Sequence, residues 1–321
     1  VLMMTGEPTV RAAVTCIKVG ALDYLSKPLD IAEVRNVVTG ALLRGRETIL
    51  NGRVIMDPEE DLARRLFRDY RILRTIGSGS MGIVLLVEGL VDGEPQQFAL
   101  KMMKPEFLTA DPELKREWLL RFSQEVQMAS RVRHPGVAQV LGHDLIGHNQ
   151  VPYILMEYCT GAPLNRWAQA RPSLTRERTL RILLSVAEVL EAVHEQGVCH
   201  RDVKPSNILV GDDDQVKLTD FGISRRVDLT LSTRPMGTPL YMSPEAFLRA
   251  KPDPRSDVFA LGVIAYELLL GQRPFEGDSI GAVVHAIRTE LPKSPCSLDP
   301  TFPEAVEVVL AGMLRKNPDA R

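Results

Sequence analysis

The chain has 321 residues, of which 45% are hydrophobic and 25% are charged. This is the composition of a folded globular protein, and it argues against global disorder. With 39 basic side chains against 41 acidic ones the formal net charge is −2, so we expect no nucleic-acid partner. At about 150 residues per domain, the length predicts about two domains.

The cysteines and the apolar stretches indicate the compartment. The 4 cysteines are scattered without a CxxC pair, which suggests neither a zinc site nor a disulfide framework and predicts a reducing cytoplasm. No apolar run reaches the roughly 18 residues that a membrane helix needs. The first residues contain neither a basic segment before the apolar run nor an initiator methionine. We therefore expect no signal peptide, and we expect the chain to be a fragment.

Residues 1–47 have the pattern of a small α/β unit. Val1–Met4 and Tyr24-Leu25 are short apolar runs that predict strands, and Thr9–Gly20 has the spacing of an amphipathic helix. Asp30 is a suitable N-cap for a second helix. Residues 48–69 are charged and contain turn dipeptides, which indicates a linker with at most a short helix at Pro58–Phe67.

From Tyr70 onward the pattern first favours strands and then helices. Three runs with strand-like patterns, separated by glycine-rich or Asp-Gly turns, precede a long helical pattern and a further strand. After Gly161 the chain is mainly helical, so we expect two lobes, 70–159 and 160–321. The predicted strands are Tyr70–Ile76, Ile83–Glu88, Gln97–Met102, Pro152–Met156 and Gln215–Leu218. The predicted helices are Pro112–Val132, Arg176–Gln196, Asp257–Leu270 and Ile280–Thr289.

A glycine-rich segment follows the first of these strands and fits the pattern GxGxxG. In a dinucleotide-binding fold this pattern opens a helix, whereas here a β-branched, apolar run follows. We therefore predict a strand–turn–strand hairpin whose backbone N–H groups lie over phosphates; an ordinary glycine hairpin is the alternative. The segment consists of Gly77, Ser78, Gly79, Ser80, Met81 and Gly82.

Lys101 lies within the apolar run Phe98–Lys101. A buried ammonium group is costly without an anion, so a phosphate together with a carboxylate would satisfy it. The nearest candidate carboxylate is Glu125, on the helix that follows. The alternative is a lysine at a strand end that reaches solvent.

The segment His200–Asn207 is the most specific in the chain. Asp202 offers an acceptor for a hydroxyl proton, Lys204 a cation for a phosphoryl group, and Asn207 a metal-ligand carbonyl. Asp220, which begins Asp-Phe-Gly after a predicted strand, adds a hard carboxylate of the kind that Mg²⁺ prefers.

The chain contains, in this order, a glycine loop, a strand lysine, HRDxKxxN and DFG. This set resembles the signature set of eukaryotic-type (Hanks-type) serine/threonine protein kinases of bacteria. The resemblance covers Tyr70 to the end and continues through Gly237–Glu245, where Ser243 replaces the usual alanine of APE. It implies an α+β bilobal protein-kinase fold, with a β-rich N-lobe, an α-rich C-lobe, and ATP and Mg²⁺ as cofactors.

The resemblance also implies residue roles. Lys101 would hold the α- and β-phosphates and pair with Glu125, Asp202 would accept the substrate proton, and Lys204 would meet the γ-phosphate. Asn207 and Asp220 would bind Mg²⁺. The implied ATP-binding residues are the glycine loop with Ile76, Ile83, Val84, Ala99, Lys101, the gatekeeper Met156, and Glu157 and Cys159 of the hinge.

Further residues of the family pattern concern regulation and support. Arg201 would bind an activation loop phosphorylated at Thr230, Ser232 or Thr233. Asp257 would brace the catalytic loop. The last segment, ending at Arg321, resembles the start of the final conserved kinase segment, whose arginine usually pairs with the APE glutamate, here Glu245. We expect the C-lobe to be truncated after it.

Residues 1–47 resemble the C-terminal half of a response-regulator receiver domain, a flavodoxin-like α/β fold. Thr5 and Lys27 match the residues that contact the phosphoryl group there, and Tyr24 matches the switch aromatic. The phosphate-accepting aspartate would lie upstream of Val1. The combination implies bacterial two-component signalling, with an upstream histidine kinase acting through a complete receiver.

We therefore predict a cytoplasmic serine/threonine protein kinase that uses Mg-ATP and acts on proteins bearing serine or threonine. A pseudokinase that binds nucleotide without catalysis is the first alternative, and the intact catalytic positions argue against it. A small-molecule phosphotransferase of the same fold class is the second, and the Gly237–Glu245 segment argues against it because it shapes a peptide-binding surface. A histidine kinase lacks support, since its ATP-binding motifs are unrelated.

Overall fold

The computed structural model describes residues 2–5, 23–26, 49–50, 53–54, 70–78, 82–103, 112–146, 151–171, 174–221, 239–248 and 253–321. The chain divides into two compact units, Val1–Arg68 and Asp69–Arg321. None of the described helices is long and apolar enough to cross a membrane.

The described residues of the first unit form two pairs of short strands. Strands β1 (Leu2–Thr5) and β2 (Asp23–Ser26) pair in parallel, with Met3 opposite Tyr24. Parallel neighbours need a crossover connection, which agrees with the strand order expected for an α/β unit. The two helices expected in this unit, like Lys27, lie outside the described residues.

The segment expected to be a linker contains a strand pair that the sequence analysis missed. Strands β3 (Ile49–Leu50) and β4 (Arg53–Val54) are antiparallel and flank the dipeptide Asn51-Gly52. This dipeptide favours two-residue hairpin turns, so the signal was present in the sequence. The helix considered at Pro58–Phe67 lies outside the described residues.

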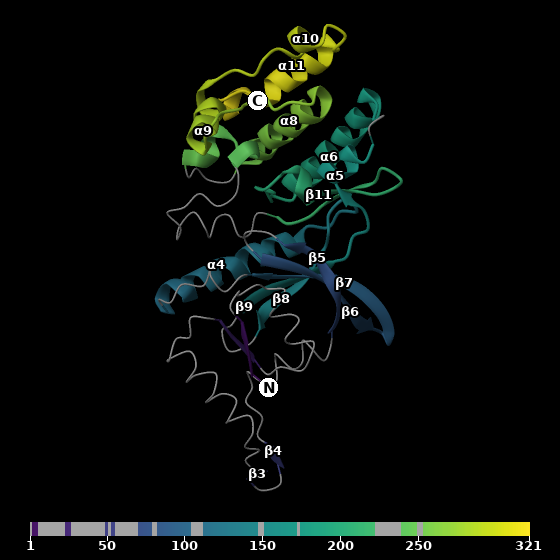
Figure 1. The fold of residues 1–321 in the computed structure, drawn as a ribbon, viewed down its shortest axis with the longest axis vertical. Helices are drawn as coiled ribbons and strands as arrows, with labels where there is room; N and C mark the ends of the chain where they lie inside the picture. The colour runs from purple at the N-terminus through teal and green to yellow at the C-terminus, as the bar shows by residue number, and fades with distance from the viewer. Residues whose placement is uncertain are drawn as a thin grey trace. The chain divides into compact units, whose positions relative to one another are not determined.

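The second unit begins with a five-stranded antiparallel sheet in the order β5-β6-β7-β9-β8 (Figure 1). The four strands expected in this part are confirmed and are longer than predicted. The fifth, β8, was missed because Gly142, His143 and Asp144 interrupt its apolar pattern. The strands are β5 (Tyr70–Ser78), β6 (Gly82–Val91), β7 (Glu94–Met103), β8 (Val140–Ile146) and β9 (Val151–Glu157).

Helix α4 (Pro112–Arg131) lies against this sheet (Figure 1). Its Phe122 and Val126 are almost completely buried, at 1% and 0% exposure. Their spacing of four residues places them on one helix face, as expected for an amphipathic helix on a sheet. The predicted helix at 112–132 is therefore confirmed within one residue.

The remaining long helices gather at the other end of this unit (Figure 1). They are α6 (Arg176–Glu195), α8 (Pro254–Leu270) and α9 (Ile280–Thr289). Helix α8 begins three residues before the predicted start, because Asp253 caps it and Pro254 occupies its first turn. It ends at Gly271, whose φ of 70° is in the left-handed region that suits glycine.

Several shorter elements complete this part of the unit. Strand β12 (Val216–Leu218) confirms the strand predicted at Gln215–Leu218, whereas α11 (Glu304–Met313) was missed although it is as long as α9. One hydrophobic core runs from the sheet through α4 and α6 to α8, and a second surrounds Phe259 and Phe275. The short elements are β10 (Ala162–Pro163), α5 (Leu164–Gln169), η2 (Pro205–Asn207), β11 (Ile208–Val210), β12 (Val216–Leu218), η3 (Pro239–Tyr241), η4 (Pro244–Leu248), α10 (Pro295–Leu298), α11 (Glu304–Met313) and η5 (Pro318–Ala320).

Candidate functional site

One face of the five-stranded sheet collects several residues expected to bind nucleotide. In the antiparallel register Val84 lies opposite Lys101, and Ala99 lies opposite Met156. Residues directly opposite each other share a face, and so do Ala99 and Lys101, which are two apart on β7. The structure therefore brings these four side chains to one face of the sheet.

The glycine-rich hairpin is present, although its tip is not described. Strands β5 and β6 pair up to Ser78 opposite Ile83, and Gly79, Ser80 and Met81 lie outside the described residues. A Cβ atom at Gly82 would sit 2.2 Å from the carbonyl oxygen of Met102. Glycine at this position is therefore required by the neighbouring strand β7, independently of any phosphate.

Lys101 forms an ion pair that the sequence analysis did not predict. Its Nζ donates to Asp220 Oδ1 at 2.7 Å, and the lysine side chain is only 15% exposed. The expected partner, Glu125, belongs to α4, but its side chain lies outside the described part of the structure. Burial by itself would raise the pKa of Asp220, and the Lys101 ammonium group holds it below its usual value.

The catalytic-loop side chains form a compact cluster. Lys204 Nζ donates to Asp202 Oδ2 at 2.6 Å, and Asn207 Nδ2 donates to the same oxygen at 2.9 Å. Asn207 Nδ2 also donates to the backbone oxygen of Asp202 at 2.9 Å, which fixes the amide orientation. The Asp202 carboxylate is thus held by two donors while its side chain remains 11% exposed.

Asp257 braces this loop, as expected. Its carboxylate is 2% exposed and accepts the backbone N–H groups of His200 and Arg201, both at 2.8 Å. His194 Nε2 lies 2.9 Å from the same carboxylate. These contacts support the left-handed backbone of Arg201, whose φ of 66° is strained for a residue with a side chain.

His200 is a neutral structural side chain. It is completely buried, and burial lowers its pKa. Nε2 lies 3.0 Å from the carbonyl oxygen of Thr219, so it carries the proton, and Nδ1 accepts the backbone N–H of Asp202 at 3.3 Å. The ring also stacks on Phe221, with centroids 4.7 Å apart. His200 thus connects the Asp202 loop to the Asp220 segment.

The two expected metal ligands lie on neighbouring segments. The backbone oxygen of Asn207 accepts the N–H of Thr219 at 2.9 Å, immediately before Asp220. Within the described ranges no group of three or more His, Cys, Asp or Glu residues is arranged to hold a metal. Mg²⁺ is commonly bound by one or two protein ligands together with phosphate oxygens, so this donor set suits a metal that arrives with a nucleotide.

The predicted hinge follows β9. The gatekeeper position Met156 is buried, and the side chain of Glu157 forms an ion pair with Lys217. Burial and the nearby Glu157 raise the pKa of Cys159 to about 11, so its thiol is protonated at neutral pH. The sequence analysis did not predict this ion pair and did not identify Lys217.

Glu245 pairs with Arg321, as the sequence resemblance suggested. The guanidinium group donates to the two carboxylate oxygens at 2.7 and 2.6 Å, and the arginine side chain is 0% exposed. Burial alone would raise the pKa of Glu245, but the hydrogen bond from Arg321 lowers it. Ser256 donates a further hydrogen bond to Glu245 at 2.8 Å.

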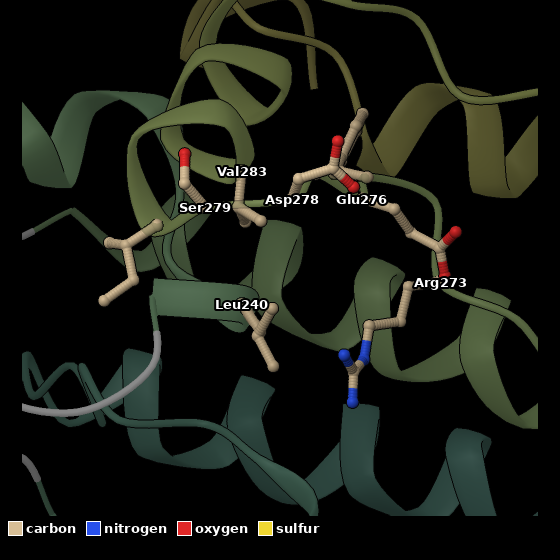
Figure 2. A pocket seen from close by; sticks show the side chains of 9 residues that line it. Leu240, Arg273, Glu276, Asp278, Ser279 and Val283 are labelled. Carbon is tan, nitrogen blue, oxygen red and sulfur yellow. The ribbon is translucent and has the colours of Figure 1, made fainter.

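A surface hollow of about 600 Å³ adjoins the segment at Pro239–Tyr241 (Figure 2). Leu240, Phe275 and Val283 supply apolar lining, while Glu276 and Asp278 lie on the loop before α9. The hollow borders the segment that was expected to shape a peptide-binding surface, because Leu240 belongs to that segment.

Other predicted residues are not tested by this geometry. Ile76, Gly77 and Ser78 end β5, and Thr5 and Tyr24 lie on β1 and β2. The candidate phosphorylation sites Thr230, Ser232 and Thr233 lie outside the described residues. The contacts of His194 and Lys217 were missed because each joins residues at least 60 positions apart, and the sequence carries no local signal for them.

Comparisons with known proteins agree with this geometry. A family model described as the protein kinase domain matches residues 70–321. The serine/threonine-protein kinase PknA of Mycobacterium tuberculosis is 36% identical over 261 residues, which are 78% of this chain and 58% of that protein. PrkC of Bacillus subtilis is 30% identical over 261 residues, which are 80% of this chain and 39% of that protein.

A solved structure shows the same fold. The kinase domain of Mycobacterium tuberculosis PknI superimposes with a TM-score of 0.60 at 28% sequence identity, covering 79% of this chain and 90% of that one. The chain spans little more than half the length of PknA and less of PrkC.

Proposed function

Because the chain belongs to the protein kinase domain family, we propose that it is a serine/threonine protein kinase that transfers the γ-phosphoryl group of ATP to protein hydroxyl groups. The observations that carry the proposal are the cluster of Asp202, Lys204 and Asn207 and the Lys101–Asp220 ion pair. Serine/threonine specificity is supported by Lys204 in Asp-Val-Lys-Pro and by Thr238 in Gly-Thr-Pro.

In this proposal Asp202 orients the substrate hydroxyl and accepts its proton while the oxygen bonds to the γ-phosphorus and the bond to ADP breaks. Lys204 lies beside Asp202 and is placed to stabilise negative charge on the transferred group. ATP supplies the phosphoryl group, and Mg²⁺ neutralises its charge. Asn207 and Asp220 would hold the metal, and Lys101 would hold the α- and β-phosphates.

The donors that hold Asp202 fix the orientation of its carboxylate. Lys204 and Asn207 both donate to Oδ2. The proposal therefore assigns proton acceptance to a carboxylate whose orientation these two donors fix.

The test is phosphate transfer from labelled Mg-ATP onto the chain itself and onto a generic basic protein. Label on serine or threonine is expected for the wild type and for Asp212→Asn, whose side chain is fully exposed. The label should disappear in Asp202→Asn. Nucleotide binding without transfer in the wild type would contradict catalysis and favour a pseudokinase. Transfer to aminoglycoside or choline-type acceptors rather than protein would contradict the substrate class.

The proposal extends to regulation. Phosphorylation of Thr230, Ser232 or Thr233 would order the activation loop through Arg201. If mass spectrometry of active protein found all three of these side chains unmodified, the proposed regulation would be contradicted.

We also propose a modular organisation, with a receiver-like segment at 1–47, a linker at 48–69 and the kinase domain at 70–321. The receiver part rests on Thr5, Tyr24 and Lys27, and it implies an upstream histidine kinase in bacterial two-component signalling. The test uses a longer protein that contains the whole receiver. If its kinase activity were equal with and without acetyl phosphate, this signalling role would be contradicted.

The compartment proposed is the cytoplasm. Cys159, Cys199 and Cys296 are free thiols, which suits a reducing environment. Fractionation of the source cells with an antibody against the chain would test this.

A further inference from the structure

Three residues from separate segments meet behind the hinge, and we call them the hinge bracket: Gln139, Glu157 and Lys217. Glu157 ends β9, Lys217 lies on β12 three residues before Asp220, and Gln139 precedes β8. Lys217 Nζ forms an ion pair with Glu157 Oε1. The other carboxylate oxygen, Oε2, accepts the backbone N–H of Gln139 at 3.2 Å.

The bracket is fixed through the backbone as well. The Glu157 N–H donates to the Gln139 carbonyl oxygen at 2.8 Å, so these two residues exchange hydrogen bonds in both directions. The Gln139 side chain is itself held, because Nε2 donates to the carbonyl oxygens of Ser130 and Val140 at 3.1 and 2.9 Å. Ser130 belongs to the last turn of α4, so the bracket connects to that helix.

The segment before Gln139 is attached to β12. Leu218 N–H donates to the Gly136 carbonyl oxygen at 2.7 Å, and Ala138 N–H donates to the Leu218 carbonyl oxygen at 2.8 Å. Residues 136–138 therefore move with β12, the strand that leads to Asp220. The Glu157 carboxylate joins the hinge to this assembly from two sides, through Lys217 and Gln139.

The charges in the bracket are partly shielded from water. The side chains of Lys217 and Glu157 are 28% and 37% exposed. Among the described residues Lys217 has no other ion-pair partner, and Glu157 pairs only with Lys217. Removing either side chain therefore leaves the other charge uncompensated and breaks the direct side-chain link between the hinge and β12.

We propose that Glu157 and Lys217 are positioning residues, which hold the hinge at a fixed distance from the Asp220 segment and so prepare the nucleotide site before ATP binds. This inference rests on the proposed function, because it assigns adenine binding to the hinge and metal binding to Asp220. A prepared site binds more tightly, because less ordering remains to be done on binding. The bracket touches no reacting group, so its loss should weaken nucleotide binding while the transfer step itself is retained.

The test compares Lys217→Met and Glu157→Gln with the wild-type chain. Glu157→Gln keeps an acceptor for the Gln139 N–H and removes only the ion pair. Asp214→Asn is the matched control, because it breaks the Arg178–Asp214 pair, whose side chains are similarly exposed at 35% and 30%, away from the hinge. Both bracket variants should raise KM for ATP about fivefold, corresponding to about 1 kcal/mol, with kcat unchanged.

The control variant should leave KM for ATP as in the wild type. An unchanged KM in both bracket variants would overturn the proposal. A raised kcat would overturn it as well, since the bracket would then restrain the reaction rather than prepare the site. If the rise in KM came from a general loss of stability, Asp214→Asn would show the same rise in KM, and that result would overturn the proposal.

A second measurement does not depend on phosphate transfer. Hydrogen exchange of the nucleotide-free chain is followed in peptides that cover the Glu157 amide and, for comparison, the middle of α6. Exchange at Glu157 should be faster in Lys217→Met, while exchange in α6 should match the wild type. Equal exchange at Glu157 would overturn the bracket. A wild-type chain that neither binds nucleotide nor transfers phosphate would contradict the proposed function. If Lys217→Met still exchanged faster at Glu157 than this wild type, the positioning of the hinge would remain supported.

Discussion

Replacing Arg321 by methionine tests how the APE-type glutamate is held. The guanidinium group donates to both oxygens of Glu245 and to the carbonyl oxygens of Arg255 and Arg315 at 2.8 Å. Glu245 is only 11% exposed, so the variant leaves a nearly buried carboxylate with Ser256 as its remaining side-chain donor. Breaking a buried ion pair from one side costs about 3–5 kcal/mol.

The expected shift in melting temperature follows from that cost. For a unit of this size 1 kcal/mol corresponds to about 2–4 °C, so a loss of about 4 kcal/mol lowers Tm by roughly 8–16 °C. The assay is thermal unfolding followed by circular dichroism at neutral pH. The double variant Glu245→Gln, Arg321→Met should lose less than the single variant, because it leaves no buried charge. A single variant within about 2 °C of the wild type would refute this reasoning.

The same pair predicts a pH dependence. In the folded chain burial acts to raise the pKa of Glu245, but the hydrogen bonds that it accepts and the charge of Arg321 together lower it. A carboxyl group with a lowered pKa contributes stability above its unfolded pKa and loses it as the pH falls through the folded value. The difference in Tm between the wild type and Arg321→Met should therefore be largest near neutral pH and shrink on acidification below about pH 4.5.

Three further variants test the site and its support. Asp257→Asn should lower Tm and kcat together, because the amide cannot accept from both backbone N–H groups of the catalytic loop; unchanged unfolding and kinetics would argue against the brace. Lys101→Met should weaken binding of a fluorescent ATP analogue about tenfold, because one charge-assisted contact is lost. The control Lys293→Met, at an exposed position, should bind the analogue as the wild type does. Burial lowers the pKa of Lys316 to about 8, so its charge destabilises the fold below that pH. The Tm of the wild type relative to Lys316→Met should therefore rise between about pH 8 and pH 10, and a constant difference would contradict this.

The parts of the site that are local in sequence were predicted well. Asp202, Lys204 and Asn207 lie within six consecutive positions, and one short loop brings them together. The strand and helix periods indicated where these elements lie, and the helices α4, α6 and α9 agree with the prediction within one residue. Strand β8 was missed because its polar centre breaks the alternation on which that prediction depends.

Sequence by itself thus determined the order of the elements, the family pattern and the chemistry carried by the loop at 200–207. Tertiary structure decided which distant charges meet: Lys101 with Asp220, Lys217 with Glu157, and His194 with Asp257. The physical reason is that hydrophobic periodicity records only whether a side chain is buried. Which partner satisfies a buried charge depends on the packing of segments 60 or more residues apart, and no local pattern encodes that arrangement.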